Sequence, residues 1–234
     1  MIAGIIAAGD GSRLAQSHPA TVKPLVPIAG RPLAHWIVDG LKSAGVKNLV
    51  VLTNSRGSAV GPSLSTSFPE MAFDFICADT ASSFESFRLV ALRLAEANDA
   101  FLISTVDALI PSPDIQRFFN ECRAARADAG LALTKFVDDE KPLWVDVDEV
   151  GLATAVGADA QSRSAVTCGL YYMTRAAAER LPPASAHARL RDFWTGLVRE
   201  RARVAGVVLA KTLDVDRPQD VAAAAEFLTH GASR

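Results

Sequence analysis

Four residues near the start of the chain have the types and the spacing that a polyphosphate site requires. Gly9 and Gly11 follow the apolar run at residues 2–8, and Arg13 and Lys23 come after them. The run has the length of a buried parallel strand, and glycines at its end let backbone N–H groups approach a ligand closely. Arginine can hold two phosphate oxygens with its planar fork, and lysine adds a mobile positive charge. This stretch therefore predicts a loop that binds a phosphorylated ligand.

The spacing of this stretch excludes two common glycine loops. A dinucleotide fingerprint needs G-x-G-x-x-G leading into a helix, but the third position is Leu14, and Pro19 and Pro24 interrupt any helix. No G-x-x-x-x-G-K-[ST] string occurs, which excludes a P-loop. The structural alternative is a plain glycine turn with two solvated cations.

Two strings, AAGDGSRL at 7–14 and KPLVPIAGRPL at 23–33, resemble the nucleotidyltransferase family that makes nucleoside-diphosphate sugars. The family signature is A-A-G-x-G-[ST]-R, a variable gap, and K-P-L-[VL]-P-[IV]-x-[GN]-x-P. The resemblance implies that Arg13 contacts the β- and γ-phosphates of a nucleoside triphosphate and that Lys23 contacts its α-phosphate. It implies catalytic roles for Arg13, Lys23 and Asp107. The implied nucleotide-binding residues are Ala7, Ala8, Gly9, Gly11, Ser12, Arg13, Lys23, Thr80 and Ala81.

Asp107 is the first candidate ligand for a metal ion. It follows the apolar run at 100–105, and open parallel sheets bind ligands beyond the carboxyl ends of their strands. By position alone, this carboxylate could hold Mg²⁺ or cap a turn or helix. The resemblance favours the metal, because the family carries its metal-binding aspartate at this strand end.

The second metal ligand is predicted in the string DVDRPQD at 214–220, which resembles the family's D-[VI]-D-T-P-E-D. That alignment implies Asp216, whereas alignment to the W-x-D-x-G of sugar-phosphate enzymes implies Asp214. The two alternate along a predicted strand, so only one can easily meet Asp107, and we prefer Asp216. Asp220 is expected in the first turn of the following helix, where the helix dipole favours a carboxylate. Asp146 and Asp148 form another D-x-D, which we interpret as a solvated hairpin turn.

Three other strings relate to the substrates. Family members close the base site with G-T-A-x-[AS]; here Thr80 and Ala81 fit, but Asp79 replaces the glycine. The V-x-E-K-P string, whose lysine binds the sugar phosphate in many relatives, is missing after the middle hairpin. Lys135 and Arg163 are possible substitutes. Gly169 fits the family's [AS]-G-[IV]-Y strand, which implies that it binds the acceptor.

Composition restricts the class of protein. The chain has 234 residues, half of them hydrophobic, which is enough for one substantial core. A formal net charge of −2 without a basic stretch argues against a nucleic-acid surface. Three widely spaced cysteines without C-x-x-C pairing predict reduced core thiols. No leader and no run of membrane-spanning length is found, so we expect a cytoplasmic protein that does not bind membranes. His18, in the phosphate loop, is interpreted as a solvated residue.

Alternating strand and helix patterns predict one α/β domain. We expect a three-layer α/β/α arrangement with a mixed, mainly parallel, Rossmann-like sheet and a small antiparallel extension. Residues 1–128 would form the nucleotide-binding half, 129–211 the acceptor-binding half, and 212–234 the last ligand-bearing strand and helix. Residues 55–69 read as a connection with at most a short helix. The predicted strands lie at 2–8, 48–53, 73–78, 100–105, 130–136, 143–147, 152–156, 165–173, 204–210 and 212–215, the last two completing the sheet. The predicted helices lie at 32–44, 83–97, 113–128, 174–181, 187–202 and 218–229.

The function implied by the resemblance is transfer of a nucleoside monophosphate from a triphosphate to a phosphorylated acceptor, with Mg²⁺ as cofactor. A sugar 1-phosphate is the first expectation for the acceptor, as in the synthesis of nucleotide sugars. The alternatives are a cytidylyl- or guanylyltransferase for a non-sugar phosphate, a glycosyltransferase that uses a D-x-D metal site, and a nucleotide-binding regulatory relative without turnover. The identity of the base and the oligomeric state are left open by the sequence.

Overall fold

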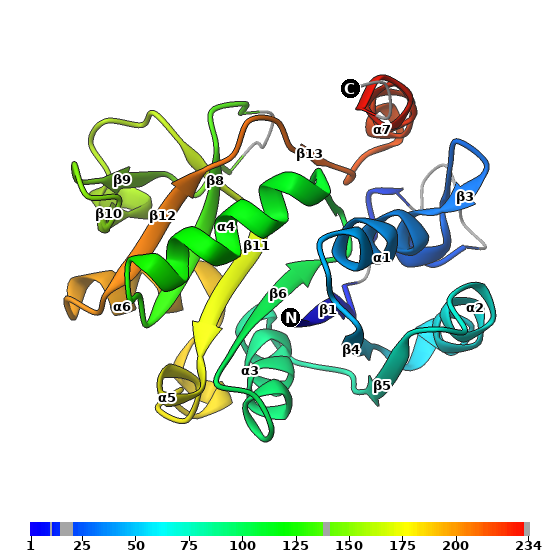
Figure 1. Ribbon diagram of the computed structural model, residues 1–234, viewed down its shortest axis with the longest axis horizontal. Helices are drawn as coiled ribbons and strands as arrows, with labels where there is room; N and C mark the ends of the chain where they lie inside the picture. The colour runs from blue at the N-terminus through cyan, green and yellow to red at the C-terminus, as the bar shows by residue number, and fades with distance from the viewer. Residues whose placement is uncertain (10, 15–20, 138–140, 232–234) are drawn as a thin grey trace.

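A seven-stranded sheet forms the centre of the computed structural model, which describes residues 1–9, 11–14, 21–137 and 141–231 (Figure 1). His18 lies outside the described residues. The strands are ordered β12-β8-β11-β6-β1-β4-β5. Their bounds are Ile2–Ala7 for β1, Asn48–Thr53 for β4, Ala72–Cys77 for β5, Ala100–Thr105 for β6, Ala129–Thr134 for β8, Val166–Thr174 for β11 and Val204–Val208 for β12.

Only β11 runs against its neighbours in this sheet, because it pairs antiparallel with both β6 and β8, while the other pairs are parallel. The mixed, mainly parallel sheet is therefore confirmed. The parallel strands other than the edge strand β5 are largely buried, as expected where helices cover both sides of a sheet.

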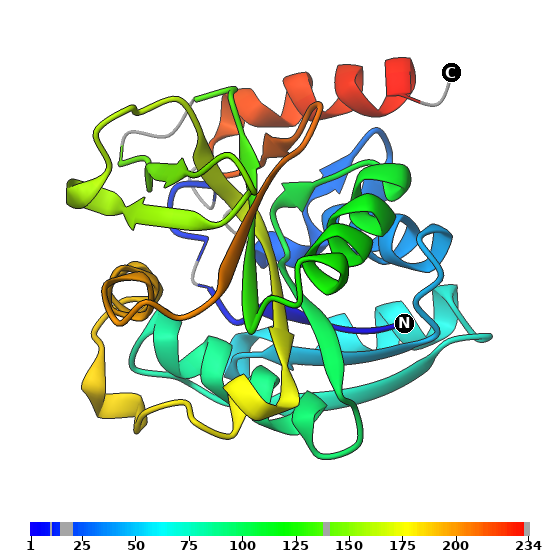
Figure 2. The ribbon, with the colours of Figure 1, turned by 60° about the vertical axis from the view of Figure 1, so that its left-hand side comes forward.

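Helices cover both faces of the sheet, and each layer encloses its own core (Figure 2). One core packs against α1 (Leu33–Ser43), α2 (Val60–Ser67), α4 (Ser112–Ala124) and α7 (Pro218–Gly231). The other packs against α3 (Ser83–Ala95), α5 (Arg175–Ala178) and α6 (Leu190–Arg199). The three-layer α/β/α architecture is confirmed. The connection predicted at 55–69 contains all of α2, whose Val60 and Leu64 are buried.

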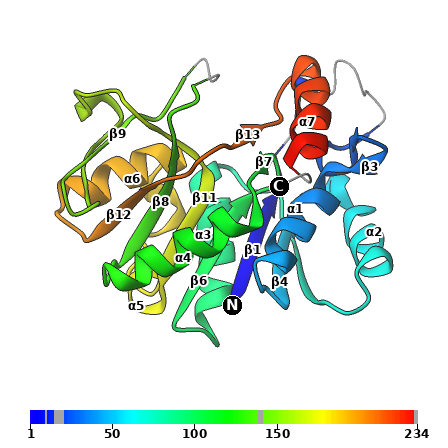
Figure 3. The same cartoon turned by 45° about the horizontal axis from the view of Figure 1, so that its top comes forward.

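Within the described residues, three two-stranded sheets accompany the central one. The predicted middle hairpin is formed by β9 (Val145–Val147) and β10 (Ala153–Val156), and β2 (Pro27–Ile28) pairs with β3 (Arg31–Pro32). The strand predicted at 212–215 does not complete the central sheet: β13 (Leu213–Asp214) pairs instead with β7 (Ala108–Leu109). The Val215 N–H donates to the Asp107 carbonyl at 3.1 Å, which holds the segment beside the end of β6 instead of beyond β12 (Figure 3).

The cysteines carry free thiols, as predicted, but only two of them are in the core. Cys122 and Cys168 are buried, whereas Cys77 is exposed at the end of β5. Cys77 is the last residue of β5, which is an edge strand of the sheet. No described helix is long and apolar enough to cross a membrane.

Candidate active site

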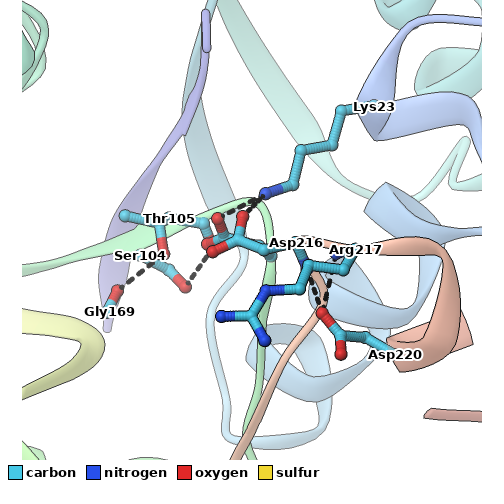
Figure 4. Close-up of polar contacts among 8 residues, drawn as sticks. Lys23, Ser104, Thr105, Gly169, Asp216, Arg217 and Asp220 are labelled. Atoms are coloured by element: carbon cyan, nitrogen blue, oxygen red, sulfur yellow. Dashed lines mark hydrogen bonds and ion pairs between the residues drawn. The ribbon is translucent and has the colours of Figure 1, made fainter. Parts of the chain in front are cut away.

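The Lys23 ammonium lies between two carboxylates at the carboxyl ends of the strands (Figure 4). Its Nζ donates to Asp107 Oδ2 at 2.7 Å and forms a second ion pair with Asp216 Oδ1. Lys23 is the first residue of the short helix at Lys23–Leu25, Asp107 lies in the loop after β6, and Asp216 lies in the turn before α7. The structure thus brings together three side chains that the sequence placed 84 and 193 residues apart.

Burial and neighbouring charges shift the pKa values of Lys23 and Asp107 in opposite directions. The Lys23 side chain is only 8% exposed, and burial by itself lowers its pKa, but the charges of Asp107 and Asp216 outweigh burial and raise that pKa above its ordinary value. Burial by itself raises the pKa of Asp107, but the Lys23 charge prevails and holds it below its usual range. Lys23 and Asp107 are therefore both charged at neutral pH.

Asp107 takes its position from the parallel sheet. Val106 continues the strand ladder, since its N–H donates to the Ile6 carbonyl at 3.1 Å. The Thr105 hydroxyl hydrogen-bonds the Asp107 carboxylate and thereby also favours its charged form. The Asp107 carbonyl accepts the Val215 N–H, so the backbone of Asp107 is tied to the segment that carries Asp216.

Asp216 is held by a side chain that the sequence did not single out for this purpose. Asp220 lies in the first turn of α7, as predicted, and is buried. Its Oδ2 accepts the N–H groups of Asp216 at 2.9 Å and of Arg217 at 2.7 Å (Figure 4). Asp220 thus fixes the turn that presents Asp216 to Lys23. The D-x-x-x-D spacing of Asp216 and Asp220 is the sequence signal that could have indicated this.

We expect Asp220→Ala to lower kcat/KM about 10-fold through misplacement of Asp216, and to lower the free energy of unfolding by about 1 kcal/mol, as for a lost helix cap. Asp220→Asn retains one acceptor oxygen and should recover part of both losses. Asp114, a first-turn carboxylate of α4 that pairs with Arg117, provides the matched control. Asp114→Ala should affect stability alone. Equal losses of activity in Asp114→Ala and Asp220→Ala would contradict the positioning role.

A cavity of about 370 Å³ adjoins the cluster, and many of the predicted residues line it. Gly11 has a left-handed φ of 58°, and a Cβ there would meet the Lys23 Cβ at 2.7 Å, so only glycine fits beside the lysine stem. Gly9 has no atom within 4 Å of its missing Cβ and faces open space. The cavity is lined by Ile6, Gly9, Gly11, Ser12, Arg13, Lys23, Thr105, Val106, Asp107 and Asp216.

Of the residues predicted to contact the base, Gly9 lines this cavity, whereas Ala7, Ala8, Thr80 and Ala81 do not. Ala7 is buried in β1, and the Ala8 carbonyl accepts from the Asn54 amide at 3.0 Å. The Thr80 hydroxyl bonds Ser86, and the Ala81 N–H donates to Glu85 at 2.7 Å. Base binding by these residues stays a prediction.

Two residues around the base strings have structural roles. Asp79, where relatives have glycine, accepts the Ser55 N–H at 2.9 Å, and this bond lowers its pKa. It therefore joins the loop after β5 to the loop after β4. Asn54 was missed from the sequence, although its place directly after β4, the neighbour of β1, is the signal that indicates it.

Gly169 lies in a bulge of β11, where the pairing with β8 shifts register between Thr167 and Tyr171. Its φ is 77°, and a Cβ would lie 2.4 Å from Thr105 Oγ1 and 2.8 Å from Ala108 Cβ. The glycine therefore lets β11 pack against the segment that carries Asp107. Acceptor binding by Gly169 stays a prediction.

We expect Gly169→Ala to lower the free energy of unfolding by about 3 kcal/mol, because left-handed strain of about 1–2 kcal/mol adds to overpacking of about 1–3 kcal/mol. Gly30 has a similar φ of 79° but no atom within 4 Å of a Cβ, so Gly30→Ala should cost only the strain, about 1 kcal/mol. Denaturant unfolding of the two variants measures the difference. Equal losses would rule out the steric contribution.

The other acidic and basic candidates lie away from the cluster. The Asp146 carboxylate accepts the N–H groups of Gln161 and Ser162, and Asp148 accepts those of Val150 and Leu152, so this D-x-D stabilises loops, as predicted. Lys135 and Arg163 do not line the cavity beside Lys23. Asp214 is exposed and lines a neighbouring cleft instead.

The donor set fits Mg²⁺, although no group of three or more His, Cys, Asp or Glu side chains gathers at one point in the described part of the chain. Asp107 and Asp216 already share one cation, the Lys23 ammonium. Mg²⁺ is bound through one or two carboxylates together with substrate phosphates and waters, so two aspartates suffice. Of the two alternatives for the second ligand, Asp216 is the one that lies beside Asp107 in this cluster. Its metal-binding role stays a prediction.

Solved structures share this fold over nearly the whole chain. The inositol-1-phosphate CTP transferase from T. maritima superposes with a TM-score of 0.81 at 18% identity, covering 99% of this chain and 96% of that one. A UDP-glucose pyrophosphorylase complexed with UDP-glucose gives 0.79 at 15% identity, covering 98% and 99%. At such identities the likeness shows the fold.

Curated relatives match over shorter stretches. The CMP-5'-(3-aminopropyl)phosphonate synthase of Streptomyces rubellomurinus (strain ATCC 31215) is 26% identical over 153 residues, 58% of this chain. The UTP--glucose-1-phosphate uridylyltransferase of Klebsiella pneumoniae is 35% identical over 61 residues, 26% of this chain. The matches span only 24% and 20% of the lengths of these relatives.

The family assignment covers far more of the chain than these relatives do. The family described as the MobA-like NTP transferase domain matches residues 3–199. The match includes β1, the glycine loop, Lys23 and Asp107, and ends before Asp216. It confirms the nucleotidyltransferase resemblance that the first two dozen residues predict, and the chain belongs to the MobA-like NTP transferase family.

Proposed function

We propose that this nucleotidyltransferase moves a nucleoside monophosphate from a nucleoside triphosphate to a phosphorylated acceptor, with Mg²⁺, and releases pyrophosphate. The observation that carries the proposal is the placement of Lys23 between Asp107 and Asp216 at the wall of a cavity that Arg13 and the glycine loop also line. A triphosphate and its magnesium ion require cations and a pair of carboxylates, and here these groups lie together at the carboxyl ends of the strands.

The chemistry is a displacement at the α-phosphorus. An oxygen of the acceptor's phospho group forms a bond to this phosphorus as the bond to the oxygen of pyrophosphate breaks, and pyrophosphate leaves with that electron pair. The nucleophile is already an anion, so no general base is needed. The protein contributes position and neutralisation of charge, as in other phosphoryl transfers.

Each charged residue has a distinct part in this scheme. Lys23 contacts the α-phosphate and stabilises the charge that grows there, while Arg13 holds the β- and γ-phosphates. Asp107 and Asp216 would hold Mg²⁺. When bound, the ion supplies charge neutralisation across the phosphates.

Two classes of acceptor are candidates. A sugar 1-phosphate is the first candidate. The relative from Streptomyces rubellomurinus, named for a CMP-phosphonate product, favours a cytidylyltransferase for a non-sugar phospho compound as the second. One of the two D-x-D strings that a glycosyltransferase could use, Asp146 and Asp148, accepts loop N–H groups, so for that alternative only Asp214 and Asp216 are left as a metal site.

Pyrophosphate release tests the proposal. The protein is incubated with Mg²⁺ and each nucleoside triphosphate in turn, with and without glucose 1-phosphate, phosphocholine, 2-aminoethylphosphonate or molybdopterin. Release that requires both an acceptor and Mg²⁺, and that stops with EDTA, supports the transferase. Nucleotide binding without turnover on any acceptor would support the regulatory alternative, and hydrolysis of a nucleotide sugar would support the glycosyltransferase.

A further inference from the structure

A cavity of about 680 Å³ lies on the face of the sheet that α1, α4 and α7 cover (Figure 3). This volume is in the range of small-molecule sites. Lys211 stands at the exposed rim of the cavity, whereas Leu41, Leu109 and Leu170 on its lining are no more than 2% exposed. The cavity therefore extends from the surface of the protein down to the central sheet.

Small side chains leave this space between the helices and the sheet. Ser104 lies in β6, Ala108 in β7 and Ser112 at the start of α4, and all three line the cavity. Protein cores fill most voids larger than a water molecule with side chains, because a void lowers stability. Larger aliphatic residues at these positions would fill the space, so a cavity of this size favours a ligand site over a purely structural core.

The walls of the cavity are largely apolar. Ile37 of α1, Ile115 of α4 and Leu228 of α7 contribute branched aliphatic side chains, and Trp36 and Phe227 add aromatic rings. A ligand that fills this space must carry an apolar body, because burying polar groups against such walls costs free energy. A flexible aliphatic chain can follow the space between three helices.

Lys211 gives the cavity a positive charge at its rim. Its Nζ lies 5.4 Å from the centroid of the Phe227 ring, which also lines the cavity. An ammonium group carries three N–H donors, so Lys211 can hold a carboxylate and keep its contact with the ring. Asp39, the acidic residue on this lining, forms an ion pair with Arg31 at 2.6 Å, which offsets its negative charge. The charge of the lining therefore favours an anionic head group.

We propose that this cavity binds a medium-chain aliphatic carboxylate, with its chain on the apolar walls and its carboxylate on Lys211, and that binding stabilises the pairing of β7 with β13. The cavity shares no lining residue with the cavity beside Lys23. Binding of the carboxylate is therefore independent of the reaction that takes place beside Lys23.

A ligand in this cavity would contact the support of the active site. Ala108 and Leu109 follow Asp107 directly and form β7, which pairs with β13. Just after β13, the Val215 N–H donates to the Asp107 carbonyl at 3.1 Å. A ligand that packs against β7 binds the paired arrangement and thereby increases its population. Opening of this pairing, which separates Asp216 from Asp107, should become rarer when the ligand is bound.

Calorimetric titration of the full chain with decanoate, octanoate and decylamine tests the site. Decanoate should bind about 15-fold more tightly than octanoate, because each of its two additional CH₂ groups contributes about fourfold when buried. It should bind about 10-fold more tightly than decylamine, whose charge Lys211 repels. Lys211→Glu should reverse this preference. Lys47→Glu provides the matched control and should change neither affinity, because Lys47 is exposed and does not line the cavity.

Hydrogen exchange tests the link to the active site. Saturating decanoate should slow exchange of the Val215 amide about fivefold or more. It should leave the Ala78 amide, which donates to the Thr53 carbonyl, unchanged. Unchanged exchange of the Val215 amide would overturn the coupling. Equal slowing of both amides would indicate general stabilisation of the protein and would likewise overturn it.

Other results exclude the ligand. Similar affinities for decanoate and octanoate would exclude burial of the chain, and similar affinities for decanoate and decylamine would exclude Lys211 as the partner of the carboxylate. Leu228→Trp, which fills the cavity from α7, should abolish binding while circular dichroism verifies folding, and unchanged binding would place the ligand elsewhere. Self-association that this variant disrupts, together with no binding of decanoate, would mean that a second copy of the chain covers the cavity.

Discussion

Lys23→Ala is expected to lower kcat/KM about 1000-fold, or about 4 kcal/mol of transition-state stabilisation. The ammonium is the buried cation of the cluster, and a solvent ion cannot replace it at a fixed position, because its stem packs against Gly11 and its head is held by Asp107 and Asp216. Pyrophosphate release measures the loss. We also expect the protein to be less stable by about 1–2 kcal/mol, since the two carboxylates then face each other, with Asp216 half-exposed and partly screened.

The same variant should bind Mg²⁺ more tightly in the absence of nucleotide, because the lysine no longer competes for the carboxylates. The rise in melting temperature on adding Mg²⁺ should therefore be larger for Lys23→Ala than for wild type. Lys42, which pairs with Glu70 on the surface, provides the matched control, and Lys42→Ala should change neither activity nor this response. A Lys23→Ala enzyme with near-normal turnover would remove the lysine from the mechanism.

Asp107→Asn is expected to lower kcat/KM by about 100- to 1000-fold while the fold is kept. The amide preserves the shape of the side chain and its contact with Thr105, but it removes one of the two negative charges that would hold Mg²⁺. The Mg²⁺ concentration for half-maximal rate should rise at the same time. This shift separates loss of a metal ligand from general damage to the site.

Asp74→Asn is the control for this substitution, because Asp74 pairs with Arg93 on the surface and lies on the edge strand β5, separated from β6 by β1 and β4. It should leave the rate and the Mg²⁺ requirement unchanged. Full activity of Asp107→Asn at ordinary Mg²⁺ concentrations would exclude Asp107 as a metal ligand.

The sequence could predict the strands that carry the site, because buried parallel strands leave continuous apolar runs with glycine or aspartate at their ends. β1, β4 and β6 follow from this pattern within a residue. The pairing of β13 could not be predicted in the same way. A strand of two residues is too short to show a periodic pattern. The backbone hydrogen bond between Val215 and Asp107 that holds it joins segments that are distant in the sequence.

The same limit applies to the candidate site. Lys23, Asp107 and Asp216 could be named from local strings, but their meeting at one point depends on the order of the strands in the sheet. Asn54 and Asp220 could be noticed from their places after β4 and four residues after Asp216, but the hydrogen bonds that give them their roles appear only in the folded chain. The close packing of Gly169 against Thr105 and Ala108 likewise depends on a bulge in β11, which only the pairing of the strands reveals.

The ion pair between Lys23 and Asp216 has a consequence for synthesis of the protein. Its partners are separated by 193 residues, so the second carboxylate leaves the ribosome long after the glycine loop and the first strands. A nascent or truncated chain that stops before Asp216 lacks one of the two carboxylates that pair with the lysine. If Asp216 holds Mg²⁺ as proposed, such a chain should not transfer a nucleotide, and activity should begin only once Asp216 has joined Lys23 and Asp107 in the folded chain.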